Sequence, residues 1–481
     1  MTDSSDIRQR LERIGQAHLL RFTDRLTPER LDALLRRIAD LDRDVHLDAV
    51  PDLVERYVRA RPEFAPTGDV APAPYYPHDP ASAVRPWDRD AARRAGETLI
   101  RDGKVAAFTV AGGQGTRLGF DGPKGCYPGG AVTGKPLFRC FAEWILAAQN
   151  RWGATIPWYV MTSPMNHEPT VAFFREQGWF GLDPKQVRHF PQGVMPSFEM
   201  ETGRILLADL DEPATNPDGH GGSLKALAAS GAVADMRSRG VEHLCYAQVD
   251  NPLVRFIDPV FIGLHAGATD SSAEMSSKML EKTEPGEKVG VFARVHGRIS
   301  VIEYSDLPAD LSAQRRDDGK LVFNAGNPAI HMLGVGFLER LNNGDGGFAL
   351  PFHRAEKKVA HIDLESGGRI EPDTPNAIKL ETFVFDALPI CERSIVLEVD
   401  RVEEFAPIKN ATGADSVESS RRLQTERAAR WLEAAGVSVP RLPDGTPDCT
   451  LEISPLTAMA AGDLSQADLP TRIDTGASLA L

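Results

Sequence analysis

The chain has 481 residues, of which 42% are hydrophobic, enough to bury cores in about two to four domains. Its formal net charge of −14 argues against nucleic acid as a partner. For the same reason, binding of a polyanionic nucleotide would need local cations and a metal ion. The five cysteines include no C-x-x-C pair, no apolar run reaches about 18 residues, and the N-terminus lacks a signal peptide's apolar segment, so we expect no zinc site, no membrane association and a cytoplasmic location.

The N-terminal part is predicted to be helical and to end in an extended connector. Across residues 4–60 apolar side chains recur at helical spacing, and Thr27 followed by Pro28 is typical of a cap and a first helical turn. Residues 61–91 contain several prolines, which favour an extended chain. We therefore expect residues 1–95 to form a helical N-terminal region with its connector.

The stretch from Val105 to Pro128, VAAFTVAGGQGTRLGFDGPKGCYP, carries the clearest functional signal. Its first six residues are apolar, which predicts a buried strand. Closely spaced glycines follow, and glycine lets the backbone approach a ligand while free N–H groups hold phosphate oxygens. Arg117 and Lys124 stand among these glycines. A strand that leads into a basic glycine loop indicates a nucleotide-phosphate site.

Two known phosphate-binding patterns are nearly matched. The segment that starts at Gly113 begins as G-x-G-x-x-G, the dinucleotide fingerprint, but Leu118 stands at the last glycine position. The segment GGAVTGKP, from Gly129 to Pro136, matches G-x-x-x-x-G-K. Pro136 has no hydroxyl group for a metal ion, so we interpret this second segment as a loop.

Helices and strands alternate beyond the glycine loop, which predicts a parallel sheet covered on both faces. We expect helices at 137–150 and 224–239, strands at 158–162 and 243–249, and a hairpin at 289–304. Ligands bind beyond the carboxyl ends of strands in such sheets, where the glycine loop and Asp250-Asn251 would both lie. The pattern changes after about residue 395, with a helix at 419–435 and a Pro- and Gly-rich tail. This change predicts a central α/β domain at 96–394 and a small C-terminal domain at 395–481.

The motifs together resemble the eukaryote-type UDP-sugar pyrophosphorylases. The matching segments are A-G-G-x-G-T-R-L-G with the following P-K-G, then F-P-Q-G at 190–193, P-D-G-H-G-G at 217–222, V-D-N at 249–251, N-A-G-N at 324–327, N-A-I-K at 376–379 and F-A-P-I-K-N at 405–410. The match runs from about Gly15 to Lys409 and is closest to the UDP-N-acetylglucosamine branch. It implies an α/β fold, with a Rossmann-like (GT-A-like) nucleotidyltransferase domain that has a mixed, mostly parallel sheet, a helical N-terminal region and a small C-terminal domain.

The resemblance also implies a reaction, in which UTP and a hexose 1-phosphate give a UDP-sugar and pyrophosphate. The cofactor would be Mg²⁺ on Asp250, and the side-chain amide of Gln192 would read the uracil, since it offers one donor and one acceptor group. The catalytic positions are Arg117, Lys124, Asp250 and Lys379. The nucleotide-binding positions are Ala111, Gly112, Gly113, Gly115, Thr116, Lys124, Gln192, Gly219, Lys379 and Lys409. The sugar-binding positions are His220, Gly290, Glu303, Tyr304 and Asn327.

The sequence leaves alternatives open for the sugar and for the class of protein. His220 stands where the N-acetylglucosamine enzymes carry asparagine, whereas UDP-glucose pyrophosphorylases have G-H-G there. We expect N-acetylglucosamine 1-phosphate as the substrate, with glucose 1-phosphate as the alternative. A dinucleotide-dependent oxidoreductase is opposed by Leu118, and a non-catalytic UDP-sugar sensor is opposed by the retained phosphate and metal ligands. UTP and the sugar phosphate are the expected partners, on a monomer or a weak homo-oligomer.

Overall fold

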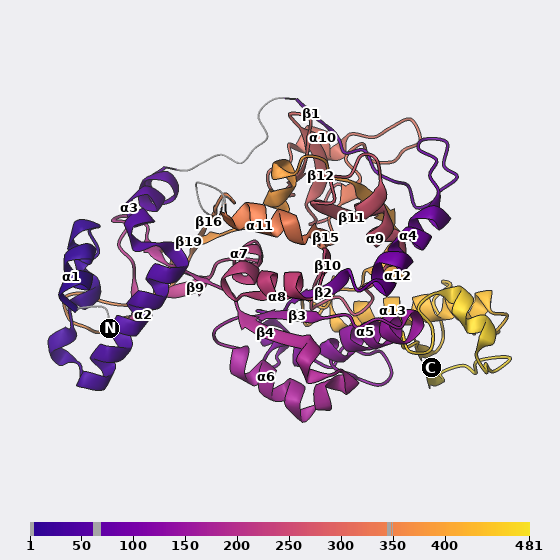
Figure 1. Cartoon of the computed structure of the whole chain (residues 1–481), viewed down its shortest axis with the longest axis horizontal. Helices are drawn as coiled ribbons and strands as arrows, with labels where there is room; N and C mark the ends of the chain where they lie inside the picture. The colour runs from indigo at the N-terminus through magenta and orange to yellow at the C-terminus, as the bar shows by residue number, and fades with distance from the viewer. Residues whose placement is uncertain (1–3, 61–68, 344–347, 349) are drawn as a thin grey trace. The chain divides into compact units, whose positions relative to one another are not determined.

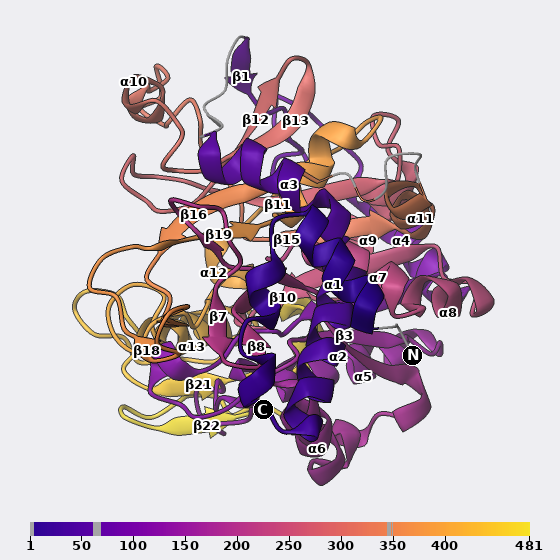
Figure 2. The same cartoon turned by 90° about the vertical axis from the view of Figure 1, so that its left-hand side faces the viewer.

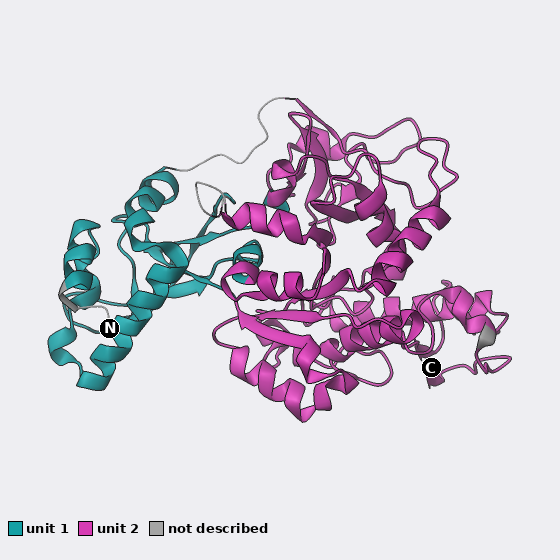
Figure 3. Ribbon diagram, viewed as in Figure 1, with its two compact units in different colours: residues 1–64, 192–226, 349–386 teal, residues 65–191, 227–348, 387–481 magenta. Residues whose placement is uncertain are grey.

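The computed structural model describes residues 4–60, 69–343, 348 and 350–481 (Figure 1). The chain forms two compact units, each assembled from separate stretches of sequence (Figure 3). Unit 1 comprises residues 1–64, 192–226 and 349–386, and unit 2 comprises residues 65–191, 227–348 and 387–481. Among the described residues, no helix combines the length and the apolar character needed to cross a membrane.

A large mixed sheet forms the centre of unit 2. Its strands are β1 (Val70–Pro72), β2 (Val105–Val110), β3 (Trp158–Thr162), β4 (Val187–Pro191), β10 (His243–Gln248), β11 (Met275–Glu281), β12 (Val291–Val295), β13 (Arg298–Ile302), β14 (Ala325–Gly326), β15 (Ile330–Gly334) and β20 (Val396–Val399). They run in the order β1-β12-β14-β11-β15-β10-β2-β3-β4, with β13 beside β12 and β20 beside β11. The pairs among β10, β2, β3 and β4 are parallel, as is β11 with β20, and the other pairs are antiparallel. The α/β class, the strands after the glycine loop and the hairpin are confirmed.

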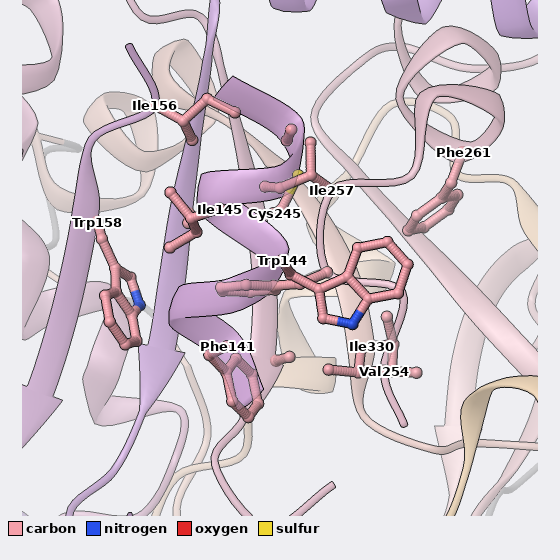
Figure 4. Close-up of a cluster of buried hydrophobic side chains, with 14 of the residues drawn as sticks. Phe141, Trp144, Ile145, Ile156, Trp158, Cys245, Val254, Ile257, Phe261 and Ile330 are labelled. Carbon is pink, nitrogen blue, oxygen red and sulfur yellow. The ribbon is translucent and has the colours of Figure 1, made fainter. Parts of the chain in front are cut away.

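Helices cover this sheet because its central strands are apolar on both faces, as in β2 and β3. The helices of unit 2 are α4 (Arg89–Arg101), α5 (Leu137–Trp152), α6 (His167–Glu176), α8 (Ala232–Ser238), α9 (Pro259–Gly267), α10 (Ala309–Ala313), α11 (Val335–Asn343), α12 (Arg401–Glu404) and α13 (Val417–Ala434). Phe141, Trp144 and Ile145 of α5 belong to one buried cluster with Trp158 of β3 and Cys245 of β10 (Figure 4). This core fixes the strand ends from which the candidate site residues emerge.

The C-terminal part of unit 2 has a small hydrophobic cluster of its own. Ser416 caps α13 in a reciprocal capping box with Ser419, which confirms the helix expected at 419–435. The strands β21 (Thr450–Glu452) and β22 (Ser478–Ala480) pair in parallel (Figure 2). Buried Trp431 and Leu432 of α13 and Leu451 of β21 belong to this cluster.

Unit 1 packs amphipathic helices on short strands. Its elements are α1 (Ser4–Arg13), α2 (Pro28–Val45), α3 (Val50–Leu53), β5 (Val194–Pro196), β6 (Phe198–Glu199), β7 (Leu207–Asp209), β8 (Glu212–Pro213), β9 (Thr215–Pro217), β16 (His353–Lys357), β17 (His361–Ile362), β18 (Arg369–Ile370) and β19 (Ala377–Glu381). β19 lies between β16 and β6 in a three-stranded sheet. Thr27 caps α2 by accepting the N–H of Arg30 at 3.4 Å, so the helical N-terminus and this cap are confirmed. Apolar residues of α2, such as Leu34 and Ile38, share a core with Ile378 of β19.

Two expectations need correction. The helix expected at 224–239 is two helices, α7 (Gly222–Ala229) and α8, because Gly231 adopts a left-handed conformation with φ 75° between them. The connector expected at 61–91 is not extended throughout: β1 pairs with β12 at the edge of the sheet, and α4 begins at Arg89. The first part of that connector, residues 61–68, lies outside the described residues.

Candidate active site

The glycine loop and Asp250 leave neighbouring strands at the same edge of the sheet. β2 and β10 are parallel, with Val110 opposite Gln248, so the segments after these strands emerge side by side. Lys124, which follows the loop, places its Nζ atom 3.4 Å from the Asp250 carboxylate. The two side chains are 17% and 12% exposed. A predicted phosphate ligand and the predicted metal ligand are therefore in contact at the carboxyl end of the parallel strands.

Backbone hydrogen bonds close the loop after β2 but leave some of its N–H groups free. Gly115 N–H donates to the Gly122 carbonyl at 2.9 Å, and Lys124 N–H donates to the Gly113 carbonyl at 3.0 Å. Among the described residues, the N–H groups of Gly112 and Gly113 find no acceptor. Of the other predicted nucleotide-binding positions here, Ala111 and Gly115 are buried and Thr116 is exposed. The loop thus offers free donors of the kind that bind phosphate oxygens.

Asn166 holds this loop in place, and the sequence analysis did not identify it. Its amide nitrogen donates to the carbonyls of Ala111 at 3.1 Å and Gly113 at 3.3 Å, while its Oδ1 atom accepts the Ser163 N–H at 2.7 Å. The side chain is buried. An asparagine shortly after a buried strand was the only signal available, and such residues are also common turn formers.

Arg117 is the most accessible cation of the loop. It lies in the short 3-10 turn Thr116–Leu118 and is exposed. Within the described part of the chain it has neither a hydrogen bond nor an ion pair, so its guanidinium group is available to an incoming anion.

The segment that bears Lys409 is fastened to the end of β10. Ile408 N–H donates to the carbonyl of Asp250 at 2.9 Å. The Asn251 side chain donates to the Glu404 carbonyl at 2.7 Å and accepts the Ala406 N–H at 3.0 Å. Lys409 follows immediately and is only partly buried. The backbone therefore connects the candidate metal ligand with a candidate phosphate ligand.

A single carboxylate, that of Asp250, is the candidate ligand for Mg²⁺. In the described ranges no group of three or more His, Cys, Asp or Glu side chains is arranged to hold a metal ion. Mg²⁺ keeps several waters and is usually held by one or two carboxylates together with substrate phosphates. The donor set fits an ion that arrives with a nucleotide, and it does not fit an all-protein metal cage.

Three of the predicted sugar-binding residues lie together beside the β12–β13 hairpin. Gly290 accepts the N–H of Asn327 at 2.8 Å, and a Cβ atom on Gly290 would lie 3.0 Å from a carboxylate oxygen of Glu303. The side-chain oxygen of Asn327 accepts the Ala329 N–H at 2.9 Å. Tyr304 is 49% exposed. Gly290, Glu303 and Asn327 therefore form one polar cluster. Tyr304, which follows Glu303 in the sequence, lies on the surface.

In unit 1, Gln192 lies next to an unusual buried carboxyl group. Gln192 is 7% exposed, yet its side-chain amide has no hydrogen-bond partner among the described residues. The Asp218 carboxyl is enclosed by Gly193 and Gly222, whose Cβ atoms, if present, would approach it to 2.9 and 2.1 Å. Burial and the neighbouring Asp44 raise the pKa of Asp218 to about 8. This part of unit 1 therefore has an unpaired amide beside a largely protonated acid.

The ring of His220 is fixed in one orientation. Its Nδ1 atom accepts the N–H of Val384 at 3.1 Å, and the ring stacks on Phe383 with a centroid distance of 5.1 Å and an angle of 12°. Phe383 in turn stacks on His353 at 4.1 Å. Burial, and secondarily His353, lowers the pKa of His220 to about 4. The imidazole is therefore neutral near pH 7, with its Nε2–H as the remaining donor.

Gly219 and Lys379 belong to the same local structure in unit 1. Gly219 has φ 84°, and a Cβ atom there would lie 2.4 Å from the carbonyl oxygen of Thr382, so the loop can pack on the end of β19 only with glycine at this position. Lys379 is half-buried in β19, and burial lowers its pKa. Among the described residues its ammonium group has no ion-pair partner, which leaves it available for a phosphate.

The chain matches known proteins over most of its length. The family model described as UTP--glucose-1-phosphate uridylyltransferase (UDPGP) matches residues 83–430. UDP-N-acetylhexosamine pyrophosphorylase-like protein 1 of Homo sapiens is 38% identical, with 96% of this chain and 94% of that protein covered. UDP-N-acetylglucosamine diphosphorylase 2 of Arabidopsis thaliana is 36% identical, with 95% and 90% covered. The crystal structure of the uridine diphosphate N-acetylglucosamine pyrophosphorylase from Trypanosoma brucei in complex with inhibitor is similar with a TM-score of 0.81 and 26% identity over 98% of both chains.

Proposed function

The chain belongs to the UTP--glucose-1-phosphate uridylyltransferase family, and we propose that it transfers the uridylyl group of UTP to N-acetylglucosamine 1-phosphate and releases pyrophosphate. The observation that supports this most strongly is the contact between Lys124 and Asp250 at the carboxyl ends of β2 and β10. An ammonium group and a carboxylate 3.4 Å apart, beside free loop N–H groups, suit phosphate oxygens and the metal ion that accompanies them.

The chemistry requires two anions to meet. An oxygen of the sugar 1-phosphate attacks the α-phosphorus of UTP and forms a new P–O bond. The bond from the α-phosphorus to the bridging oxygen breaks, and pyrophosphate leaves with that oxygen. The attacking oxygen is already deprotonated near neutral pH, so neither a protein nucleophile nor a general base is needed. Catalysis therefore depends on positioning and on neutralising charge.

The side chains of this protein divide that work. Arg117 and Lys124 hold the triphosphate and the charge that develops on the leaving pyrophosphate. Lys379 and Lys409 are further phosphate ligands, proposed from the family motifs. The ammonium group of Lys379 has no ion-pair partner among the described residues, whereas that of Lys409 lies 3.6 Å from the Asp415 carboxylate and would exchange this contact for a phosphate. Asp250 would hold Mg²⁺, which supplies charge neutralisation on the phosphates when it is bound.

Selection of uracil is assigned to Gln192, whose buried amide is free to pair with a base. A ligand that satisfies a buried donor and acceptor is favoured strongly over one that leaves them unpaired. UTP should therefore exceed ATP and GTP in kcat/KM by at least about a hundredfold. Gln192→Ala should reduce this ratio about tenfold or more, as measured by pyrophosphate release. Equal use of purine nucleotides by the unmodified protein contradicts the assignment.

N-acetylglucosamine 1-phosphate is the proposed sugar substrate because relatives that match nearly the whole chain are named for N-acetylated sugars. The polar cluster of Gly290, Glu303 and Asn327 supports a ligand with several hydroxyl and amide groups. Glucose 1-phosphate is the second candidate, since His220 is bulkier than an amide and its ring is held by Phe383 and cannot turn aside freely.

The test of this function is a pyrophosphate-release panel with four nucleoside triphosphates and several sugar 1-phosphates, with and without Mg²⁺. We expect the highest kcat/KM with UTP and N-acetylglucosamine 1-phosphate, and no activity in EDTA. Preference for glucose 1-phosphate would support the second candidate. Absence of pyrophosphate release with every pair would refute the function.

We further propose that the protein works in the cytoplasm on small molecules alone, as a monomer or a weak homo-oligomer. The net charge of −14 supports the absence of nucleic-acid partners. Light scattering over a range of protein concentrations tests the oligomeric state, and a stable large assembly contradicts it.

A further inference from the structure

The second glycine loop, Gly129–Lys135, binds a carboxylate of the protein itself. The N–H groups of Val132 and Thr133 donate to one oxygen of Glu452, at 2.8 and 2.9 Å. The hydroxyl group of Thr133 donates to the other oxygen at 2.8 Å, and the Lys135 Nζ atom lies 3.0 Å from that oxygen. Successive N–H groups, a hydroxyl and a lysine on one anion are the contacts by which a G-x-x-x-x-G-K loop holds a phosphate.

The remaining N–H groups at the start of this loop are also satisfied. Those of Gly129 and Gly130 donate to the Lys135 carbonyl, at 2.9 and 3.1 Å. Ala131 N–H donates to the side-chain oxygen of Gln424 at 3.2 Å, and the Gln424 amide donates back to the Gly129 carbonyl at 2.9 Å. The loop is therefore fastened to the C-terminal part of the chain through α13 and β21, and its N–H groups from 129 to 133 all have acceptors.

Charge around Glu452 is balanced without any ligand. Glu452 is 5% exposed, and Lys135 lies between it and Glu143, at 3.0 and 2.5 Å. Arg139 donates to Glu143 at 3.1 Å, so two cations face two carboxylates. Burial acts to raise the pKa of Glu452, but Lys135 and the loop N–H groups outweigh it and hold that pKa below its ordinary value. A Cβ atom on Gly130 would lie 2.9 Å from Glu452, so glycine permits this close approach.

A continuous chain of hydrogen bonds leads from this loop to Lys124. The Lys124 carbonyl accepts the N–H of Tyr127 at 3.0 Å, and the Tyr127 carbonyl accepts the N–H of Leu137 at 3.0 Å. The stem between them is closed by the Gly129 N–H on the Lys135 carbonyl. The turn that carries Lys124 is thus continuous with the loop that Glu452 holds.

We propose that Glu452 is the resident anion of the Gly129–Lys135 loop and that, by filling it, this carboxylate positions Lys124 for catalysis. Glu452 touches no substrate in this account and is a positioning residue. The loop binds no nucleotide because its donors are already used. The catalytic part of the proposal rests on the proposed function, whereas the occupancy of the loop does not.

The first test is Glu452→Gln, which keeps the shape of the side chain but removes the charge and one acceptor oxygen. We expect kcat to fall at least tenfold while the KM for the sugar phosphate stays unchanged, because Lys124 is displaced and the sugar site is not. Glu426→Gln is the matched control, since Glu426 pairs with Arg441 on an exposed surface of the same C-terminal part, and it should retain full activity. An unchanged kcat in Glu452→Gln overturns the positioning role.

The second test measures anion binding directly and does not depend on turnover. In Glu452→Ala, sodium acetate should raise the melting temperature and restore part of the lost kcat, whereas it should leave the unmodified protein unchanged, with sodium chloride at equal ionic strength as the control. Absence of a thermal shift overturns the anion site. If the unmodified protein proves inactive, the proposed function fails while the acetate shift still decides whether the loop is an anion site.

If both Glu452 variants fail to fold, Thr133→Ala replaces them in the test. This substitution removes the hydrogen bond from the Thr133 hydroxyl group to Glu452 and keeps the carboxylate. We expect a fall of about threefold in kcat at unchanged KM for the sugar phosphate. A kcat equal to that of the unmodified protein overturns the positioning role.

Discussion

The two glycine loops that follow β2 use their backbone donors in opposite ways. In the first, residues 111–119, the N–H groups of Gly112 and Gly113 find no acceptor within the described chain, and Arg117 has no ion pair there. In the second, Gly129–Lys135, the N–H groups and the lysine are bound to Glu452 and its neighbours. Yet the second loop, like the first, misses a known phosphate-binding pattern by a single residue. A glycine motif identifies donors, and the rest of the fold decides whether they remain free for a ligand.

The most damaging change to the first loop should be removal of its cations. Lys124→Ala and Arg117→Ala should each lower kcat by about two to four orders of magnitude, because each loses a charge-assisted contact with the transition state. Arg101→Ala, on the exposed end of α4, is the matched control and should be unaffected. Steady-state pyrophosphate release measures the effect. A near-normal kcat in either variant would show that the first loop does not hold the phosphates.

Removing the carboxylate beside Lys124 should have the next largest effect. Asp250→Asn should raise the Mg²⁺ concentration for half-maximal activity at least about tenfold, because a neutral amide oxygen is a poorer ligand for a hard cation. Circular dichroism should show an unchanged fold. The metal role is refuted if the Mg²⁺ titration of the variant overlays that of the unmodified protein.

The sugar preference should shift by a factor no larger than this when the fixed imidazole is replaced. His220→Asn should increase kcat/KM for N-acetylglucosamine 1-phosphate relative to glucose 1-phosphate about tenfold, since an amide is smaller and offers both a donor and an acceptor. Measuring both substrates with both proteins gives the ratio. A ratio that does not move shows that His220 has no part in choosing the sugar.

The smallest effect concerns the buried carboxyl group of Asp218, in the P-D-G-H-G-G segment at 217–222. Unlike the ionised Glu452, Asp218 has a raised pKa of about 8, and its Oδ1 atom has no partner among the described residues. Because the folded pKa exceeds the unfolded value, its contribution to stability is complete below about pH 4 and is lost as pH rises toward about 8.

Asp218→Asn removes this titration, so its melting temperature should fall less than that of the unmodified protein between pH 5 and pH 8. Differential scanning calorimetry of the two proteins at several pH values measures the difference. Parallel curves across this range contradict the assignment of a neutral carboxyl group.

The sequence predicted the elements that apolar patterning controls and the motifs that glycine marks. The strand at Val105–Val110 and the meeting of the glycine loop with Asp250 follow from local pattern and from the geometry of parallel strands. The break at Gly231 was missed because glycine inside a helical pattern is often tolerated. The partners of Gly129–Lys135 lie some 290 to 320 residues away in sequence, and no local pattern indicates such contacts.

The central claim is that the first glycine loop, and not the second, receives the phosphates of UTP. A crystal structure of the protein with UTP and Mg²⁺ tests it most directly. We predict phosphate oxygens within about 2.7–3.2 Å of the N–H groups of Gly112 and Gly113, with Glu452 still bound to Thr133. A triphosphate held by Gly129–Lys135, with Glu452 displaced, would contradict the account.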